Sequence, residues 1–204
     1  MIFLKTDIIG VDIMKKGLLL FFMILLSLIL IACNSQTRHT SLTPLTDRTL
    51  LDVDYEGKVF TEDGIGVVTL TRCVDGDTAR FSEDGGNTDF SVRFLGIDTP
   101  EVGRNPEPWG RAASQFTCDR LSNAFEIVLE RNTEGPLKDM YGRYLAFVWY
   151  DGRLINLELI ELSYASIMGA IVTKYGEPMQ NAWYEAVASR RRIHGDIDPD
   201  FNYD

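Results

Sequence analysis

Three carboxylates lie at the ends of predicted strands or just beyond them. Asp77 ends the turn sequence Asp75-Gly76-Asp77, and Asp98 and Glu101 belong to the sequence Asp98-Thr99-Pro100-Glu101. The strands that carry Asp77 and Asp98 are expected to be neighbours, so these two side chains can converge. Hard divalent cations prefer carboxylate and backbone carbonyl oxygens as ligands. The pattern is therefore typical of a metal site built from oxygen ligands.

Two arginines accompany these carboxylates. Arg93 lies on the predicted strand that leads to Asp98, and Arg143 follows the turn Tyr141-Gly142. A guanidinium keeps its proton and offers forked hydrogen-bond donors to phosphate oxygens. Two such groups beside a metal ion suit the transition state of phosphodiester hydrolysis, because oxygens there gain negative charge.

Each of these motifs has a simpler interpretation when it is taken alone. Asp-Gly-Asp is more often a plain turn than a metal ligand, and Asp98-Thr99-Pro100 can be a turn or a cap. A single arginine on a strand is usually a surface charge or packs its aliphatic stem. It is the joint occurrence of the motifs that favours a functional site.

The elements that must position these residues follow from the hydrophobic pattern. Five strands are predicted, at Val67–Val74, Thr78–Phe81, Phe90–Leu95, Phe125–Glu130 and Tyr144–Tyr150. Three helices are predicted, at Gly110–Ala124, Leu154–Ala165 and Pro178–Arg192. Five short strands with a helix after the third predict an α+β fold that is mainly β, a five-stranded OB-fold barrel with three helices.

The N-terminal region carries the pattern of a bacterial lipoprotein signal. Met14-Lys15-Lys16 is a short positive region, and an almost wholly apolar run from residue 17 to residue 32 leads directly to Cys33. The run is shorter than the roughly 20 residues of a membrane-spanning helix, and this order of segments describes a secretory signal. We expect residues 1–32 to be removed and Cys33 to be lipidated.

Alternatives to this interpretation are a plain membrane anchor and a leader that is cleaved elsewhere. Residues 1–13 carry two aspartates and do not fit the head of a signal, so translation can begin at Met1 or at Met14.

The remaining boundaries follow from composition. Residues 33–64 are expected to form the lipidated cysteine and a flexible tether, because the first part of this stretch is rich in Ser, Thr, Asn and Gln. An OB domain is predicted over residues 65–195 and an acidic tail over residues 196–204. The chain is therefore predicted to be exported and membrane-anchored, at the cell surface or in the periplasm.

The overall composition bounds the class of protein. The chain has 204 residues, of which 45% are hydrophobic and 25% are charged, and such values are ordinary for a globular domain. Its formal net charge of −10 argues against nucleic-acid binding through bulk positive charge. This charge leaves room for an enzyme with a local basic site.

The three cysteines are too few for a disulfide scaffold and lack zinc-ribbon spacing. Cys73 lies on the first predicted strand and Cys118 on the first predicted helix. Export permits a bridge between them, but sequence does not give the geometry that a bridge requires. We favour two separate thiols.

Three ordered blocks resemble the signature of the staphylococcal nuclease (thermonuclease) family. They are Asp75-Gly76-Asp77-Thr78, the stretch from Val92 to Glu101, and Asp139-Met140-Tyr141-Gly142-Arg143. The resemblance extends over about residues 67–192. It implies an OB-fold barrel with three helices and calcium-dependent hydrolysis of phosphodiester bonds in DNA and RNA.

The same resemblance implies a calcium site. Asp77 and Asp98 match the family's calcium-binding carboxylates, and the backbone carbonyl of Thr99 matches a third ligand.

It also implies the groups that act on the substrate. Arg93 and Arg143 match the phosphate-binding arginines, and Glu101 matches the glutamate that acts on the attacking water. Tyr141 matches the tyrosine that reaches the phosphate end of a bound nucleotide.

The chain departs from the family pattern at two positions and in its charge. Met140 stands where the family has a lysine, and Gly169 aligns best with the tyrosine on which a base stacks. The family archetype is basic, whereas this chain is acidic. Weaker long-range attraction to a polyanion is expected to lower the rate of association.

These observations predict a calcium-dependent endonuclease acting on DNA or RNA, anchored to a membrane through Cys33 and monomeric. One alternative is a non-catalytic OB-fold lipoprotein that binds nucleic acid or protein, since OB barrels often bind single strands without cutting them. Another is a surface lipoprotein that supports an assembly. The presence of all three carboxylates and both arginines favours the enzyme.

Overall fold

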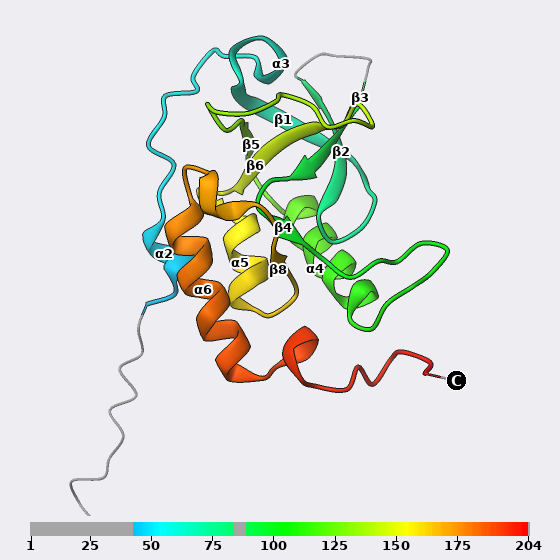
Figure 1. The fold of residues 1–204 in the computed structure, drawn as a ribbon. Coiled ribbons are helices and arrows are strands. Elements are labelled where there is room, and N and C mark those ends of the chain that lie inside the picture. The colour runs from blue at the N-terminus through cyan, green and yellow to red at the C-terminus, as the bar shows by residue number, and fades with distance from the viewer. Residues whose placement is uncertain (1–42, 84–88, 204) are drawn as a thin grey trace, which may run out of the picture. The chain divides into compact units, whose positions relative to one another are not determined.

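The computed structural model of the protein describes residues 43–83 and 89–203 (Figure 1). The predicted signal of residues 1–32, the lipidation at Cys33 and the start of the predicted tether lie outside the described residues. Within the described ranges, no helix is both long enough and apolar enough to cross a membrane.

A closed β-barrel forms the centre of the fold (Figure 1). The strand order is β3-β2-β1-β5-β6-β7, and a parallel pairing of β3 with β6 closes the barrel. The five principal strands are β1 (Ile65–Cys73), β2 (Thr78–Glu83), β3 (Asp89–Phe94), β5 (Ile127–Glu130) and β6 (Tyr144–Tyr150). They correspond to the five predicted strands, so the prediction of an OB-like α+β barrel is confirmed.

Three two-residue strands complete the sheets. They are β4 (Ile97–Asp98), β7 (Arg153–Leu154) and β8 (Ser166–Ile167). β7 extends the barrel sheet beside β6, and β4 pairs with β8 in a separate antiparallel sheet. The pairing of Asp98 with Ser166 ties the segment after β3 to the segment after the second predicted helix.

The barrel encloses the hydrophobic core. All four residues of β5 are buried, as are the last five of β6, and β-branched and aromatic residues suit such strands. Large apolar side chains with at most 1% exposure fill the interior, among them Phe81, Phe94, Leu129, Phe147 and Trp149. Burial of each such side chain contributes roughly 1.5–3 kcal/mol.

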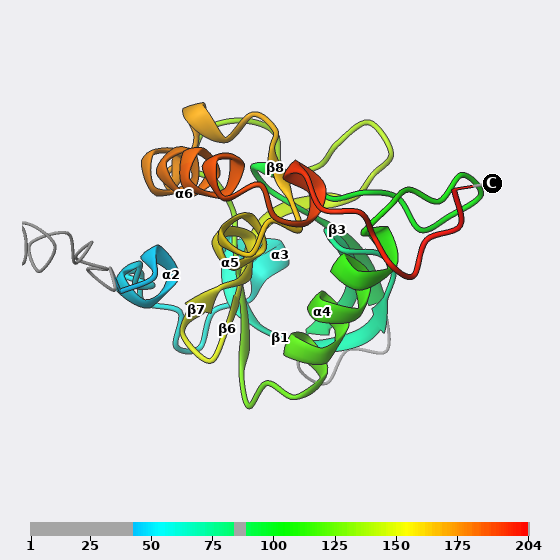
Figure 2. The same cartoon turned by 90° about the horizontal axis from the view of Figure 1, so that it is seen from below.

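The described residues contain the three predicted helices and four short helical segments. The long ones are α4 (Gly110–Ser122), α5 (Ile155–Glu161) and α6 (Gly176–Ser189), and the short ones are α2 (Leu45–Arg48), α3 (Phe60–Asp63), η1 (Ala170–Val172) and η2 (Arg192–His194). α4 packs on β1, and α5 packs on both β6 and α6 (Figure 2).

Two helices end three or more residues before their predicted ends. α5 ends at Glu161 because Ser163 adopts a left-handed conformation with φ of 59°, which turns the chain toward β8. α6 ends at Ser189 because Arg190 is left-handed, with φ of 53°. A left-handed residue stops the helical hydrogen-bond ladder.

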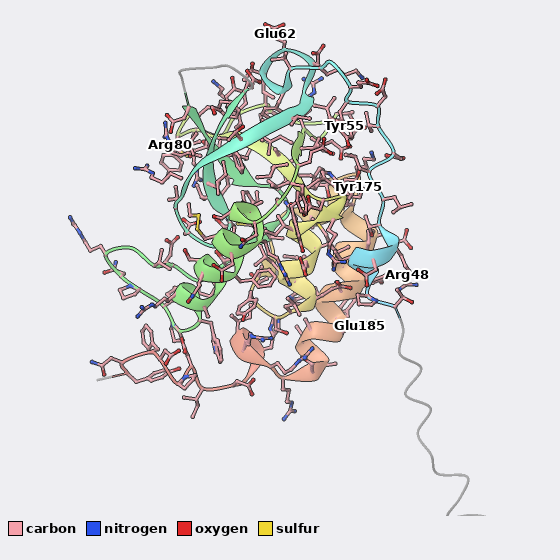
Figure 3. All side chains as sticks on the ribbon, turned by 180° about the vertical axis from the view of Figure 1, so that it is seen from behind. Arg48, Tyr55, Glu62, Arg80, Tyr175 and Glu185 are labelled. Carbon is pink, nitrogen blue, oxygen red and sulfur yellow. A yellow bond between two sulfur atoms is a disulfide. The ribbon has the colours of Figure 1, made fainter. Side chains whose placement is uncertain are left out.

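The buried carboxylate of Glu130 joins the barrel to the start of α6. It accepts hydrogen bonds from Trp149 Nε1 at 3.0 Å and Tyr175 Oη at 2.9 Å, and it pairs with Lys174 Nζ at 2.8 Å. The ring of Tyr175, which is labelled in Figure 3, packs edge-on against the rings of Phe147 and Trp149 according to their interplanar angles of 87° and 73°. The partners satisfy a buried charge that would be costly if it were alone.

The prediction of a flexible tether is wrong for residues 43–64. Phe60 is fully buried and packs against the rings of Phe90 and Tyr144. The backbone N–H of Leu45 and the hydroxyl of Thr46 donate to Glu161. The buried ring of Phe60 and the polar contacts with Glu161 hold this stretch on the domain, together with partly buried apolar side chains that pack against the core, namely Leu45, Leu51, Val53 and Tyr55. These contacts are scattered along the stretch and produce no periodic sequence pattern.

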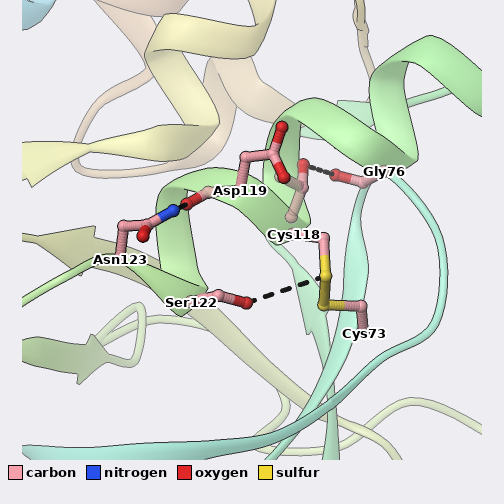
Figure 4. Close-up of a disulfide and its surroundings, with 7 residues drawn as sticks. Cys73, Gly76, Cys118, Asp119, Ser122 and Asn123 are labelled. Atoms are coloured by element: carbon pink, nitrogen blue, oxygen red, sulfur yellow. Dashed lines mark hydrogen bonds between the residues drawn. A yellow bond between two sulfur atoms is a disulfide. The ribbon is translucent and has the colours of Figure 1, made fainter.

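Cys73 and Cys118 form a disulfide, with their Cα atoms 5.6 Å apart (Figure 4). The prediction of two separate thiols is therefore wrong. α4 lies across β1 and brings together two residues that are 45 positions apart in sequence. This packing is a tertiary feature that the cysteine spacing does not encode.

Candidate active site

The turn between β1 and β2 holds Asp77 against Thr99. Asp77 is only 5% exposed, and its Oδ2 accepts hydrogen bonds from the Thr99 backbone N–H at 2.7 Å and the Thr99 hydroxyl at 3.1 Å. Its other oxygen accepts from the Thr78 hydroxyl at 3.1 Å. A Cβ added at Gly76 would lie 2.7 Å from Thr99 Oγ1, so the close approach requires glycine at that position.

α4 supports this turn from the other side. The hydroxyl of Thr117 donates to the carbonyl oxygen of Gly76 at 2.7 Å, and the Cys73–Cys118 disulfide lies next to this contact (Figure 4). The position of Asp77 is thus fixed by β1, by α4 and by the segment that contains Thr99.

Arg93 connects the two aspartates predicted to bind the metal. Its Nη1 lies 3.0 Å from Asp77 Oδ2, and its Nη2 lies 2.7 Å from Asp98 Oδ1. Nη1 also donates to the carbonyl oxygens of Ile97 at 2.8 Å and Phe94 at 3.2 Å. Arg93 is 8% exposed, so the structure brings Asp77, Asp98 and Thr99 together around one nearly buried guanidinium.

The two aspartates differ in their electrostatic environment. Burial raises the pKa of Asp77 to about 6, although the nearby charge of Arg93 acts in the opposite direction. The side chain of Asp98 is about half exposed, at 54%. A buried carboxylate disfavours its charged form unless a positive charge compensates it.

The donor set fits a hard cation. Asp77 and Asp98 offer carboxylate oxygens and Thr99 offers a backbone carbonyl, which are the oxygen ligands that Ca²⁺ takes. In residues 43–83 and 89–203, no three Asp, Glu, His or Cys side chains are grouped closely enough to hold a metal. A bound ion would therefore depend on the Thr99 carbonyl and on water in addition to the two aspartates.

Glu101 lies on the exposed loop that follows β4. Its carboxylate makes no hydrogen bond or ion pair with the described residues, but its backbone is held firmly. The Glu101 N–H donates to Glu107 Oε2 at 3.0 Å, and the Glu101 carbonyl oxygen accepts from the Glu107 N–H at 2.8 Å. The carboxylate is thus available to solvent on a fixed backbone.

Arg143 and Tyr141 lie on the turn before β6. The β3–β6 pairing begins with Val92 opposite Tyr144, so Arg143 is next to the strand that carries Arg93. The guanidinium carbon of Arg143 is 5.6 Å from the centre of the Tyr141 ring, which is 76% exposed. No direct contact joins Arg143 or Glu101 to the Asp77–Arg93–Asp98 group within the described part of the chain.

Asp139 organises that turn, a role that the sequence interpretation did not assign. Its carboxylate accepts from Arg143 Nε at 2.7 Å and from the backbone N–H groups of Tyr141 and Arg143, each at 2.9 Å. Desolvation acts to raise the pKa of Asp139, but these hydrogen bonds lower it below the usual range. An Asp side chain often accepts a hydrogen bond from the backbone N–H two residues further along the chain, so Asp139 is a recognisable sequence signal for this turn.

The chemistry that this arrangement permits is recognition of a phosphate beside a cation. The positively charged groups and the carboxylates occupy adjoining elements, namely the β1–β2 turn, the end of β3, the loop after β4 and the turn before β6. The exposed side chains of Glu101 and Tyr141 and the partly exposed guanidinium of Arg143 can meet a ligand without exposing the core.

Comparison with known proteins agrees with this geometry. The model of the family described as "Staphylococcal nuclease homologue" matches residues 91–194, about half of the chain. Asp77 precedes the matched segment, and its contacts with Arg93 and Thr99 join it to that segment.

Similar proteins include the thermonuclease of Staphylococcus intermedius, which is 43% identical over 93 residues, covering 44% of this chain and 52% of the relative. The SPbeta prophage-derived endonuclease YokF of Bacillus subtilis is 35% identical over 201 residues, covering 88% of this chain and 66% of the relative. Endonuclease YncB of the same organism is 32% identical over 171 residues, covering 76% and 79%. The matching stretch thus spans about half the length of the first relative and just under two thirds of the second. The chain belongs to the staphylococcal nuclease family.

Proposed function

We propose that the protein is a calcium-dependent endonuclease that hydrolyses phosphodiester bonds in DNA or RNA. The observation that carries the proposal is the Arg93 guanidinium, which holds Asp77 and Asp98 together beside Thr99. The relatives named as a thermonuclease and as endonucleases support the same reaction class.

Asp77, Asp98 and the carbonyl of Thr99 are the groups that would hold Ca²⁺. When bound, the ion supplies positive charge that stabilises developing negative charge on phosphoryl oxygens. Arg93 contacts both carboxylates and holds them close together. The proposed metal ligands are therefore positioned before a metal ion binds.

The remaining residues act on the substrate. Arg143 is held through Nε by Asp139, so its two Nη groups can donate to phosphoryl oxygens. Glu101 accepts a hydrogen bond from the attacking water, which orients the water toward phosphorus. The exposed ring of Tyr141 lies beside Arg143 and can contact the phosphate end of a nucleotide.

We further propose that the enzyme is exported, anchored through a lipid at Cys33 and monomeric. The Cys73–Cys118 disulfide supports an oxidising compartment, because disulfides persist outside the cytosol. Millimolar extracellular calcium can fill even a weak oxygen site. Fractionation of a Cys33→Ser variant tests the anchor, since release from membranes or loss of processing is expected and an unchanged membrane fraction would contradict it.

Cleavage assays test the reaction. The purified protein is incubated with plasmid DNA and with RNA, with Ca²⁺ or with excess chelator, and product is followed by electrophoresis. We expect cleavage that requires Ca²⁺ and poor rescue by Mg²⁺, since Mg²⁺ demands tighter octahedral geometry. Full activity in chelator would exclude the calcium assignment.

Glu101→Gln provides the matched test of the site. The substitution keeps the size of the side chain and is expected to lower kcat by roughly 10²–10⁴, the share of a general base. Glu62→Gln is the control, because Glu62 is exposed on α3 (Figure 3). If the wild-type protein binds nucleic acid and never cleaves it, the alternative of a binding lipoprotein replaces the proposal.

A further inference from the structure

The C-terminal segment of residues 196–203 lies beside the first turn of α4 and the loop that carries Glu101 (Figures 1 and 2). This segment follows the part of the chain that matches the family model, which ends at residue 194. The prediction of an acidic tail described its composition. Most of the segment is exposed, but Asp198 is only 5% exposed and anchors it to the domain.

Asp198 is the centre of this packing. Its Oδ2 accepts a hydrogen bond from the Trp109 backbone N–H at 2.5 Å, and its Oδ1 accepts from the Asp200 N–H at 3.0 Å. The Asp198 N–H donates to Tyr203 Oη at 3.0 Å. In addition, Trp109 Nε1 donates to the carbonyl oxygen of Asp196 at 3.1 Å. The segment therefore holds Trp109 through both its backbone and its indole ring.

Trp109 needs such a partner because of where it lies. It is the residue before α4, it adopts a left-handed conformation with φ of 69°, and no side chain caps the helix there. A tryptophan in this conformation is strained. The first N–H groups of a helix lack partners within the helix and favour a nearby negative charge. Asp198 supplies both an acceptor and a charge from 89 residues away in sequence.

Backbone contacts connect the neighbourhood of Trp109 to Glu101. Gly110 is packed so closely that a Cβ added there would lie 2.4 Å from the Glu101 carbonyl oxygen. The Gly110 N–H donates to the Glu107 carbonyl oxygen at 3.1 Å, and Glu107 makes two hydrogen bonds with the backbone of Glu101. Glu107 and Gly110, which lie two residues before and one residue after Trp109, thus belong to the group that fixes the backbone of Glu101.

We propose that Asp198 is a positioning residue that holds Trp109 and thereby keeps the Glu101 carboxylate at the active site. The proposal rests on the proposed nuclease function for the role of Glu101. Asp198 contacts neither substrate nor metal. Its effect is on geometry, and a displacement of about 1 Å at a catalytic group can lower a rate by roughly 10²-fold.

The experiment compares Asp198→Ala and Asp198→Asn with a matched control. Alanine removes the acceptor, whereas asparagine keeps a carbonyl acceptor and removes the charge. Asp200→Asn is the control, because Asp200 lies on the same segment and its carboxylate makes no hydrogen bond or ion pair with the described residues. Circular dichroism and thermal unfolding check that each full-length variant is folded.

Two readouts separate positioning from general stability. Steady-state cleavage gives kcat and KM, and trypsin cleavage after Arg104 reports on the loop itself, since Arg104 is exposed between Glu101 and Trp109. For Asp198→Ala we expect kcat to fall roughly 10- to 100-fold, KM to change less than about twofold, and cleavage after Arg104 to become faster. Asp198→Asn is expected to lie between Asp198→Ala and wild type in both kcat and the rate of cleavage after Arg104. Asp200→Asn is expected to match wild type in both.

Several outcomes would overturn the proposal. It is wrong if Asp198→Ala and Asp198→Asn keep the wild-type kcat, or if kcat falls while cleavage after Arg104 is unchanged. It is also wrong if KM rises in proportion to the fall in kcat. The trypsin assay requires no nuclease activity. An inactive wild-type protein would therefore refute the proposed function, and the rate of cleavage after Arg104 would still show whether Asp198 restrains the loop.

Discussion

Asp77 accepts two hydrogen bonds from Thr99, one from its backbone N–H at 2.7 Å and one from its hydroxyl at 3.1 Å. These bonds join the β1–β2 turn to the segment after β4. They also orient the Thr99 peptide, whose carbonyl oxygen is a proposed calcium ligand. Thr99 therefore supports Asp77 through its two donors, and in the proposed site it would also bind calcium through its carbonyl oxygen.

Gly76→Ala is expected to disturb this relationship. The new Cβ would lie 2.7 Å from Thr99 Oγ1 and 2.9 Å from Thr99 Cβ, so Thr99 must move. Overpacking of this kind typically costs 1–3 kcal/mol. We expect calcium affinity, measured by isothermal titration calorimetry, to weaken by at least about tenfold, which corresponds to about 1.4 kcal/mol.

Gly103→Ala is the control for this prediction, because a Cβ there meets no atom within 4 Å. Both variants should remain folded when they are examined by circular dichroism. Equal calcium affinity in Gly76→Ala and wild type would show that the Thr99 peptide is not a ligand.

The disulfide between Cys73 and Cys118 is expected to stabilise the domain. It closes a loop with a sequence separation of 45 residues, and the loop-entropy model gives about 4 kcal/mol for such a loop. Urea unfolding of the wild type and of the Cys73→Ser/Cys118→Ser double variant measures the difference. Because the bridge anchors α4 beside the Asp77 turn, calcium affinity should fall in the double variant as well.

Peptide mapping after alkylation of denatured, unreduced protein checks the bridge directly. Cys73 and Cys118 should resist alkylation until a reductant is added. Labelling of both thiols before reduction would contradict the bridge in the protein as purified.

The parts of the fold that were predicted are those in which local pattern and tertiary structure agree. β1 and β6 are long and rich in β-branched or aromatic residues, so their sequence indicates strands. β4 and β8 contain two residues each, and no periodicity exists over such a length. The burial of Phe60 depends on a gap beside Phe90 and Tyr144, which exists only after the barrel has closed.

The candidate site was predictable to a similar degree. Asp77 and Asp98 were expected to converge because their strands were expected to be neighbours. The structure pairs β2, which begins after Asp77, with β3, which leads toward Asp98. Asp98 itself lies on β4, which pairs with β8. The guanidinium of Arg93 contacts both carboxylates. This contact depends on the directions of the side chains, which the spacing of residues in the sequence does not give. The contact of Asp198 with Trp109 spans 89 residues and follows no repeating pattern, so only the folded structure reveals it.

His194 is expected to make stability depend on pH. Burial lowers its pKa from the ordinary value of 6.5, and its Nε2 is buried without a hydrogen-bond partner among the described residues. The folded state therefore binds fewer protons than the unfolded state below pH 6.5. The free energy of unfolding should fall as pH decreases from about 6.5, by at most about 1.4 kcal/mol per pH unit from this group.

Urea unfolding at pH 7.0 and 5.5 measures this effect for wild type and His194→Gln. The variant should lose part of the pH dependence, because glutamine does not titrate. NMR titration of the imidazole gives the pKa of the folded state. A value at or above 6.5 would contradict the expected direction.

Arg143→Lys is expected to lower kcat much more than it changes substrate binding. Asp139 holds Arg143 through Nε at 2.7 Å, which leaves both Nη groups of the planar fork for the phosphoryl oxygens. Lysine keeps the charge but loses the fork. Removal of one preorganised donor commonly costs about 10²–10³ in rate, or roughly 3–4 kcal/mol, because the donor matters most when charge accumulates in the transition state.

Single-turnover cleavage and nucleotide affinity, measured on the same samples, separate these effects. Arg153→Lys is the matched control, since Arg153 on β7 is 37% exposed, Arg143 is 31% exposed, and both pair with carboxylates. The control should cleave at the wild-type rate. If Arg143→Lys loses affinity in proportion to rate, Arg143 contributes ground-state binding alone, and a groove that binds nucleic acid without cutting it becomes the better description of the site.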